Sequence, residues 1–217
     1  MSGEPEGPWI DPEEARTGLL LWAPADPGPA FPDELAAVLA TGAAAAVVLG
    51  AADSVSRTAR DRCRSSGVAC LALDDPELAR TLRADGVHLG DAVGVPEARR
   101  RLGTGTLIGA DCGRSRHAAM VAGEEGADYV MFGVGPGRHD AVPLLAELCG
   151  WWTGLFVLPC AVDLRGLDAD PAALAEAGAD FVAVREAVWQ HPAGAARGAL
   201  DLRRRLDEGL GQRQGSP

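Results

Sequence analysis

The sequence contains no lysine, since all 20 basic residues among its 217 are arginine. Without lysine, a Schiff-base mechanism, a lysine general base and the lysine of a Walker-type phosphate loop are excluded. Acidic residues number 31, which gives a net charge of −11. That charge argues against a nucleic-acid partner, because no basic run is longer than the Arg triplets 99–101 and 203–205. We interpret each triplet as the solvated face of a helix.

Cysteine and long apolar runs are also scarce. The five cysteines are odd in number and form no Cys-x-x-Cys pair, which fits neither a disulfide framework nor a zinc site. We expect reduced thiols in or near the core at Cys63, Cys70, Cys112, Cys149 and Cys160. Residues 1–16 are acidic and proline-rich where a signal peptide would be basic and then apolar, and no run of about 18 apolar residues follows. We therefore expect a cytoplasmic protein with no membrane partner.

Short apolar runs alternate along the chain with Ala/Leu/Arg/Glu stretches of helical period, a rhythm typical of βα units with a parallel sheet. The predicted strands cover residues 18–24, 44–50, 68–73, 85–90, 106–111, 128–133, 155–162 and 180–184. The predicted helices cover residues 32–41, 53–66, 76–84, 95–102, 114–125, 141–153, 170–178 and 192–208. Eight of each predict an α/β fold, a (β/α)₈ TIM barrel built as one domain from residues 17–206. We expect mobile tails at 1–16 and 207–217.

A weak internal repeat supports the barrel. The segments RADGVHLG, EGADYVMFG and AGADFVAV each place Ala-Asp just before a buried strand. We interpret this pattern as one supersecondary unit copied around a ring.

An acidic residue stands near the end of every predicted strand, on the side where a barrel of this type carries its active site. These residues are Asp26, Asp53, Asp74 or Asp75, Asp91, Asp111, Asp140, Asp163 and Glu186. Few basic groups could neutralise these carboxylates: Arg114, Arg116 and His117 after the fifth strand, and Arg138 and His139 after the sixth. Such a ring repels pyrophosphate unless metal ions intervene and favours a cation, a metal or an amine-bearing ligand. The competing interpretation, which we favour for Asp53, Asp75 and Asp91, is helix capping.

Three further features have both a structural and a functional interpretation. The loop VGPGRHD (134–140) could cradle a phosphate on backbone N–H groups beside a guanidinium, but a simple turn is the interpretation that we favour. His88 lies between strand residues and is interpreted as a hydrogen-bonded core histidine rather than a base. The pair Trp151-Trp152 is expected to pack a helix end on the barrel, the alternative being an aromatic lid.

The strand sequences ADGVHLG (84–90), LIGADCGRSRHAA (107–119), GADYVMFG (126–133) and AGADFVAV (177–184) resemble the fourth, fifth, sixth and eighth strands of the thiamine phosphate synthase family, which includes thiazole tautomerases. The resemblance covers roughly residues 67–190. It implies a (β/α)₈ barrel that joins hydroxymethylpyrimidine pyrophosphate to a thiazole phosphate and releases pyrophosphate, with Mg²⁺ as cofactor. Such dissociative chemistry requires a metal ion and fixed positive charge.

The chain departs from the family pattern where that chemistry takes place. GAADSVSR (50–57) replaces a Gln-x-Arg segment, and Leu73-Asp74 or Asp74-Asp75 stands at the Asn-Asp pair. Four further positions differ in the same way: Asp91 replaces Gln, Asp111-Cys112 replaces Ser-Thr, Asp163 falls in the double Gly that grips phosphate, and VREAV (184–188) lacks the Ser after the eighth strand.

If the protein is an active synthase-type transferase, we expect Asp74, Asp75 and Asp91 to hold Mg²⁺ and Asp111 and His139 to take catalytic roles. The expected ligand- and phosphate-binding residues are Gly133, Gly135, Gly137, Arg138 and Asp163. Two alternatives remain open. The first is a non-catalytic binding or regulatory barrel that takes a pyrimidine or another thiamine precursor-like small molecule. The second is a tautomerase-like isomerase that uses His139 or His117 without a metal. A homo-oligomer is compatible with each.

Overall fold

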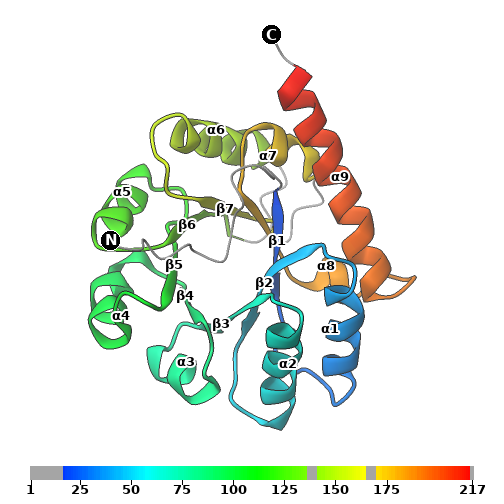
Figure 1. Ribbon diagram of the computed structural model, residues 1–217. Coiled ribbons are helices and arrows are strands. Elements are labelled where there is room, and N and C mark those ends of the chain that lie inside the picture. The colour runs from blue at the N-terminus through cyan, green and yellow to red at the C-terminus, as the bar shows by residue number, and fades with distance from the viewer. Residues whose placement is uncertain (1–16, 136–140, 165–169, 216–217) are drawn as a thin grey trace, which may run out of the picture.

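The computed structural model describes residues 17–135, 141–164 and 170–215. Eight parallel strands pair in chain order and β1 also pairs with β8, which closes a barrel and confirms the predicted (β/α)₈ fold (Figure 1). The strands are β1 (Gly18–Trp22), β2 (Ala44–Leu49), β3 (Ala69–Leu73), β4 (Gly86–Leu89), β5 (Leu107–Asp111), β6 (Tyr129–Phe132), β7 (Cys160–Asp163) and β8 (Phe181–Val184).

Helices surround the strands on the outside of the barrel (Figure 1). Within the described residues they are α1 (Phe31–Leu39), α2 (Ser54–Ser65), α3 (Pro76–Leu82), the short 3₁₀ helix η1 (Ala92–Gly94), α4 (Val95–Leu102), α5 (Arg116–Glu124), α6 (Val142–Thr153), α7 (Ala172–Glu176), α8 (Glu186–Trp189) and α9 (Ala195–Gly215). Helix α9 continues beyond residue 206, where we expected the barrel to end, and Leu206 is fully buried.

Alternate strand residues fill the inside of the barrel, as the two-residue period of a strand requires. Leu20, Leu71, Tyr129 and Met131 belong to this inner cluster, while the residues between them, such as Val130, join a second core against the helices. Gly109 leaves room for Tyr129, because a Cβ at Gly109 would lie 2.0 Å from the tyrosine Cζ. The barrel interior is therefore a packed core on which the strand ends are rigidly placed.

The Ala-Asp repeat forms the same contact three times at the amino ends of the strands. Asp85, Asp128 and Asp180 each donate their backbone N–H to a carbonyl of the preceding strand. Each then accepts that residue's N–H on Oδ2, at 2.8 Å from Cys70, 2.7 Å from Ile108 and 2.8 Å from Cys160. The repeated aspartate thus joins β3 to β4, β5 to β6 and β7 to β8.

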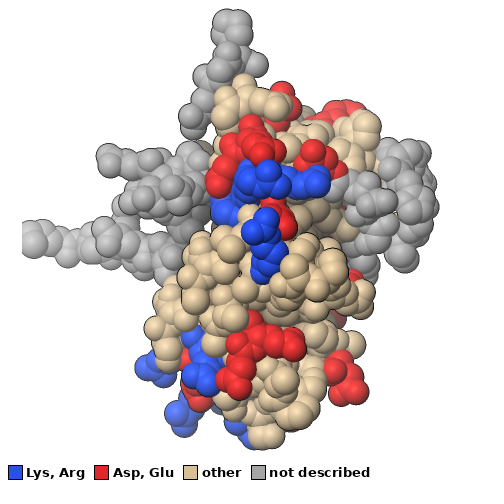
Figure 2. Space-filling model, turned by 90° about the vertical axis from the view of Figure 1, so that its right-hand side faces the viewer, with Lys and Arg blue, Asp and Glu red and all other residues tan. Residues whose placement is uncertain are grey.

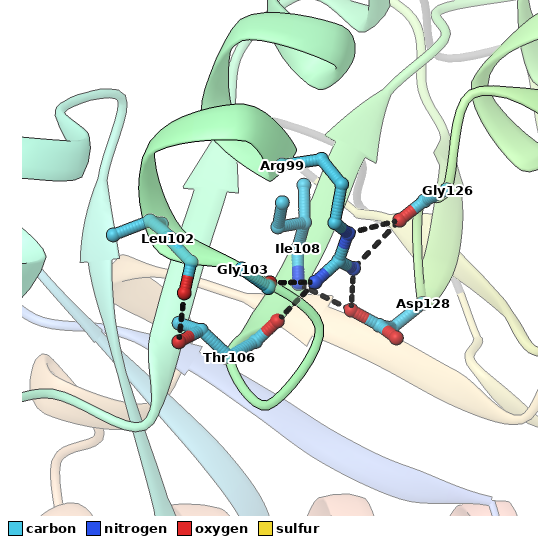
Figure 3. Close-up of polar contacts among 7 residues, drawn as sticks. All are labelled: Arg99, Leu102, Gly103, Thr106, Ile108, Gly126 and Asp128. Carbon is cyan, nitrogen blue, oxygen red and sulfur yellow. Dashed lines mark hydrogen bonds and ion pairs between the residues drawn. The ribbon is translucent and has the colours of Figure 1, made fainter.

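Arg99 on α4 completes the contact at Asp128 (Figure 3). Its guanidinium lies 2.6 Å from Asp128 Oδ2 and also donates to the carbonyls of Gly103, Thr106 and Gly126. Gly126 has φ +95°, and a Cβ there would lie 3.4 Å from Arg99 Nε. Glycine is favoured at this position because it adopts a left-handed conformation without strain and leaves space for the arginine.

The arginine triplets therefore divide between two roles. Arg100 and Arg101 are exposed and pair with Glu97, as expected of a solvated helix face, whereas only 18% of the Arg99 side chain is exposed. In the second triplet, Arg203 donates to the Thr17 carbonyl at the start of β1 and pairs with Asp207. Figure 2 shows basic and acidic side chains lying beside one another on one face of the molecule. The expectation that every triplet arginine is solvated is wrong for Arg99 and Arg203.

The predicted start of the seventh strand needs correction, and one short helix was missed. Strand β7 begins at Cys160 rather than at residue 155. In the segment before it, Phe156 stacks on Trp152 at 4.2 Å and the Leu158 backbone carbonyl accepts the Trp152 indole N–H, while Leu155 and Val157 are exposed. The pair Trp151-Trp152 packs a helix end, as expected, and Trp152 is 1% exposed. The four-residue helix α8 was not predicted.

All five cysteines are buried free thiols, as expected. No helix in the described part of the chain is both long and apolar enough to cross a membrane.

Candidate active site

The carboxyl ends of the strands form the mouth of the barrel, and three of its aspartates cap helices. Asp53 accepts the Ser56 N–H at the start of α2 at 2.7 Å. Asp75 does the same for Glu77 at the start of α3, and Asp91 for Val93 in η1, each at 2.8 Å. The hydrogen bond to Ser56 lowers the pKa of Asp53 below its ordinary value. The capping interpretation of these three residues is confirmed.

Asp74 makes a different contact, because it connects the ends of two strands. Its φ of +61° is left-handed, its N–H donates to the His88 carbonyl, and its Oδ1 accepts the N–H of Gly90. A Cβ at Gly90 would lie 2.9 Å from Asp74 Oδ1. The Asp74 carboxylate is therefore exposed beside Gly90, the residue that precedes Asp91.

No group of three or more His, Cys, Asp or Glu side chains placed to hold a metal ion occurs among the described residues. Asp111 is partly buried and accepts the N–H of Gly113 at 2.8 Å. Burial, with added repulsion from Asp111 and Asp91, raises the pKa of the neighbouring Cys112 thiol to about 12. Cys112 is therefore a neutral thiol at physiological pH and a poor nucleophile.

Asp163 and Arg185 form an ion pair across the ends of β7 and β8. Arg185 Nη2 lies 3.2 Å from Asp163 Oδ2, and the Asp163 side chain is only 4% exposed. The guanidinium also lies over the indole of Trp22, with Cζ 4.3 Å from the ring centroid. The expected set of basic groups at the mouth omitted Arg185. Arg185 directly follows the apolar residues of β8, just as Asp163 follows the apolar residues of β7, and that signal could have identified it.

A cavity of about 150 Å³ opens at the ends of β1, β2, β3 and β8. Its walls are mostly small or apolar, and Trp22, Arg185 and Glu186 add polar groups. The other lining residues are Ala23, Pro24, Ala25, Pro27, Val48, Gly50, Ala51, Ser56 and Leu73.

His88 lies close to Trp22 inside the barrel. It is 1% exposed, its Nδ1 lies 2.7 Å from the Tyr129 hydroxyl, and its ring meets the Trp22 ring edge-on at 4.9 Å. Burial raises the pKa of Tyr129 above its usual value. The interpretation of His88 as a hydrogen-bonded core histidine is confirmed.

Four of the predicted residues, Gly137, Arg138, His139 and Asp140, lie outside the described residues. Two others, Gly133 and Gly135, are described and do not line the mouth cavity. Gly133 donates its N–H to the Gly113 carbonyl at 2.9 Å. Gly135 is exposed to solvent.

The basic residues expected after the fifth strand lie at the start of α5. Arg116 pairs with Glu147 of α6 at 2.8 Å and lies over the Trp151 ring. Arg114 and His117 are exposed.

A closed ring of eight parallel strands with polar side chains at their carboxyl ends defines a (β/α)₈ barrel of the class that carries its site at that end. The family model described as thiamine monophosphate synthase matches residues 50–188. A thiamine-phosphate synthase of Rhodospirillum centenum is 39% identical over 197 residues, which cover 85% of this chain and 95% of the relative. That of Erythrobacter litoralis is also 39% identical, over 81% of this chain and 90% of the relative. The chain belongs to the thiamine monophosphate synthase family.

Solved structures agree on the fold. A thiamine phosphate pyrophosphorylase from Pyrococcus furiosus superimposes with a TM-score of 0.71 at 22% identity, over 92% of this chain and all of that one. The Amycolatopsis orientalis BexX/CysO complex gives a TM-score of 0.67 at 16% identity, over 93% of each chain.

Proposed function

We propose that this protein joins a hydroxymethylpyrimidine pyrophosphate to a thiazole phosphate, forming thiamine phosphate and releasing pyrophosphate, at the mouth of the barrel. The observation that carries the proposal is the similarity to curated thiamine-phosphate synthases over most of both chains. The matching family segment, residues 50–188, includes β3 through β8 and so most of the mouth.

Mg²⁺ is the cofactor that this chemistry implies, and Asp74 and Asp91 are the residues that fit it best. Each carboxylate is exposed and accepts a backbone N–H on Oδ1. A carboxylate has about four acceptor positions, so capacity for a cation remains. Mg²⁺ is commonly held by one or two carboxylates together with substrate phosphates, so a third protein ligand is not required. Asp75 caps α3 just as Asp91 caps η1, but Asp91 directly follows Gly90, whose N–H Asp74 accepts, and is therefore the better partner for Asp74.

When bound, Mg²⁺ would neutralise charge on the departing pyrophosphate. The residues of the chain position the reactants: Asp74 holds the ends of β3 and β4 together, while Trp22 and Arg185 offer an aromatic face and a fixed positive charge. We further propose that the groups which usually bind phosphate have been replaced. There is no lysine, and the buried carboxylate of Asp163 stands where the family pattern has glycine. Turnover should therefore depend steeply on Mg²⁺.

The test is formation of thiamine phosphate from the two substrates across a Mg²⁺ series, with Asp91→Asn as the variant and Asp75→Asn as its matched control. Asn caps helices about as well as Asp, so both variants should keep their folding stability and lose only the charge. We expect kcat/KM to fall by about 10²-fold in Asp91→Asn, the size of effect typical for loss of one electrostatic stabiliser. Asp75→Asn should stay within about twofold of wild type.

Full activity in Asp91→Asn would remove the metal assignment. A wild-type protein that makes no thiamine phosphate at any Mg²⁺ concentration would refute the synthase proposal. The buried Asp163 carboxylate specifically favours the second candidate, a barrel that binds a pyrimidine without catalysis. Stabilisation by an uncharged pyrimidine, without turnover, would support it.

A further inference from the structure

An apolar hollow lies at the amino ends of the strands, opposite the mouth and apart from the residues of the proposed reaction. Its volume is about 50 Å³, and its walls are formed by Leu20, Ala46, Asp128, Tyr129, Pro159 and Phe181. The strands β2 and β3 place only small side chains at this end of the interior, among them Ala45 and Ala69, whereas β6 and β8 place aromatic rings there. Apolar walls of this kind favour an apolar occupant over water.

The described chain begins beside this hollow. Thr17 Oγ1 donates to the Ala179 carbonyl at 2.8 Å, in the loop that leads into β8. The next N–H, that of Gly18, donates to the Asp180 carbonyl at 2.8 Å. A Cβ at Gly18 would lie 3.1 Å from Phe181 Cδ1, so β1 starts against a wall of the hollow. The sixteen residues that precede Thr17 in the sequence therefore join the barrel at this end and not at the mouth.

Those sixteen residues, MSGEPEGPWIDPEEAR, contain one aromatic side chain. Trp9 and Ile10 form an apolar pair between Pro8 and Pro12, in a segment that is otherwise mostly acidic. Trp9 precedes Thr17 by eight residues, which span up to about 26 Å because an extended chain advances about 3.3 Å per residue. Since β1 starts in contact with a wall of the hollow, this length is sufficient for Trp9 to return to it. Flanking prolines also reduce the conformational entropy that ordering the segment would cost.

We propose that the N-terminal segment folds back over the amino ends of the strands and places the Trp9 side chain on this hollow, against Tyr129 and Phe181. A hollow of about 50 Å³ is smaller than an indole, so the ring enters by one edge and its remaining surface covers the rim. Offset or edge-to-face contact with the two aromatic rings adds to the gain from burial. The segment thereby closes the barrel at the end opposite the mouth, where residues serve stability rather than the reaction.

The first test is a nuclear Overhauser spectrum of the full-length wild-type protein, without substrate. We expect contacts between the Trp9 indole protons and the ring protons of Tyr129 and Phe181, and these contacts should not depend on protein concentration. The spectrum of Trp9→Phe assigns the indole signals, because those of Trp9 are then missing.

The second test compares Trp9→Ala with Glu6→Ala, a matched control in the same segment that removes no apolar surface. Trp9→Ala should lower Tm by about 4 °C, because the burial of an aromatic ring is lost in a domain of this size. Tryptic cleavage after Arg16 should become about tenfold faster, since the protease acts on the segment once it has left the barrel. Glu6→Ala should change Tm by less than about 1 °C and leave the cleavage rate within about twofold of wild type.

Three results would overturn the proposal. Trp9 contacts with Met120 and Trp152 would place the segment in another groove, of about 280 Å³, beside α5. Contacts with Phe181 that disappear on dilution would identify the occupant as the segment of a second copy. An indole without contacts, together with equal Tm values of Trp9→Ala and Glu6→Ala, would show that this segment does not cover the hollow. Failure to synthesise thiamine phosphate would refute the proposed function and leave this inference intact, because the two concern opposite ends of the barrel.

Discussion

The two ends of the barrel use aspartate for different purposes. At the amino ends, Asp85, Asp128 and Asp180 each accept a backbone N–H from the preceding strand and so join neighbouring strands. At the mouth, Asp53 and Asp91 accept an N–H from the helix that follows them. Asp163 there pairs with Arg185 instead. The role of an aspartate is therefore not set by its position before or after a strand. It is set by the group that the fold places within hydrogen-bonding distance of its carboxylate.

The comparison separates stability from function along one axis of the molecule. The contacts at the amino ends are repeated at alternate strands and are satisfied within the chain. The mouth holds exposed carboxylates at Asp74 and Asp91, together with Trp22 Nε1 and Arg185 Nε, which find no acceptor within the described part of the chain. In barrels of this class, residues at the amino-terminal face serve stability and those at the carboxyl-terminal face serve activity. Substitutions at the two ends should accordingly affect different measurements.

The largest expected effect is that of Arg99→Ala at the amino ends. The substitution leaves the Gly126 carbonyl and the Asp128 carboxylate without a charged donor in a partly buried site, so the free energy of unfolding should fall by about 2–3 kcal/mol. Urea denaturation measures it. Arg101→Ala, in the same triplet but 58% exposed, is the matched control and should change stability by less than about 0.5 kcal/mol. Equal effects would show that Arg99 is as solvated as its neighbour.

The Arg99 contact also illustrates what the sequence could not predict. The strands and the closed barrel follow from short apolar runs at regular intervals, because strands buried on both faces carry apolar residues throughout. The Ala-Asp repeat was identified as a copied unit, but its hydrogen bonds join residues about 15–20 positions apart and leave no local signal. Arg99 and Arg101 are likewise indistinguishable until the helix is docked on the barrel.

The mouth was predicted in part. Capping by Asp53, Asp75 and Asp91 is a local interaction within three residues, so the sequence contains it. The pairing of Asp163 with Arg185 and the stacking of Arg185 on Trp22 cross from β7 to β8 to β1 and depend on barrel closure. The start of β7 was misplaced because apolar residues that pack on Trp152 resemble a strand in composition.

A smaller effect is expected for capping at the mouth. Asp53→Ala removes the acceptor of the Ser56 N–H and should lower the free energy of unfolding by about 1 kcal/mol, whereas Asp53→Asn should leave it nearly unchanged at neutral pH. Thermal and urea unfolding of the two variants provide the measurement. A loss of catalytic turnover in Asp53→Asn with unchanged stability would instead place this residue in the site.

The smallest expected effect is on the pH dependence of folding stability, which should have opposite signs for an aspartate at each end of the barrel. Burial raises the pKa of Asp180 above its ordinary value of 3.8, against the opposing hydrogen bond from Cys160 and the charge of Arg213. Between 3.8 and the raised pKa the folded protein holds a proton that the unfolded chain has released, so the contribution of Asp180 to stability falls as pH rises through this window.

Asp53 has the opposite dependence. Its pKa lies below 3.8, so the unfolded chain holds the proton longer, and its contribution is present above 3.8 and lost as pH falls through the lowered pKa. Urea unfolding of wild type, Asp180→Asn and Asp53→Asn from about pH 3 to about pH 6 compares them. Relative to wild type, Asp180→Asn should gain stability as pH rises, whereas Asp53→Asn should gain stability as pH falls toward the acidic end of the range. Slopes of the same sign would mean that burial does not govern Asp180, and the proposed difference between the two ends would then rest on hydrogen-bond partners alone.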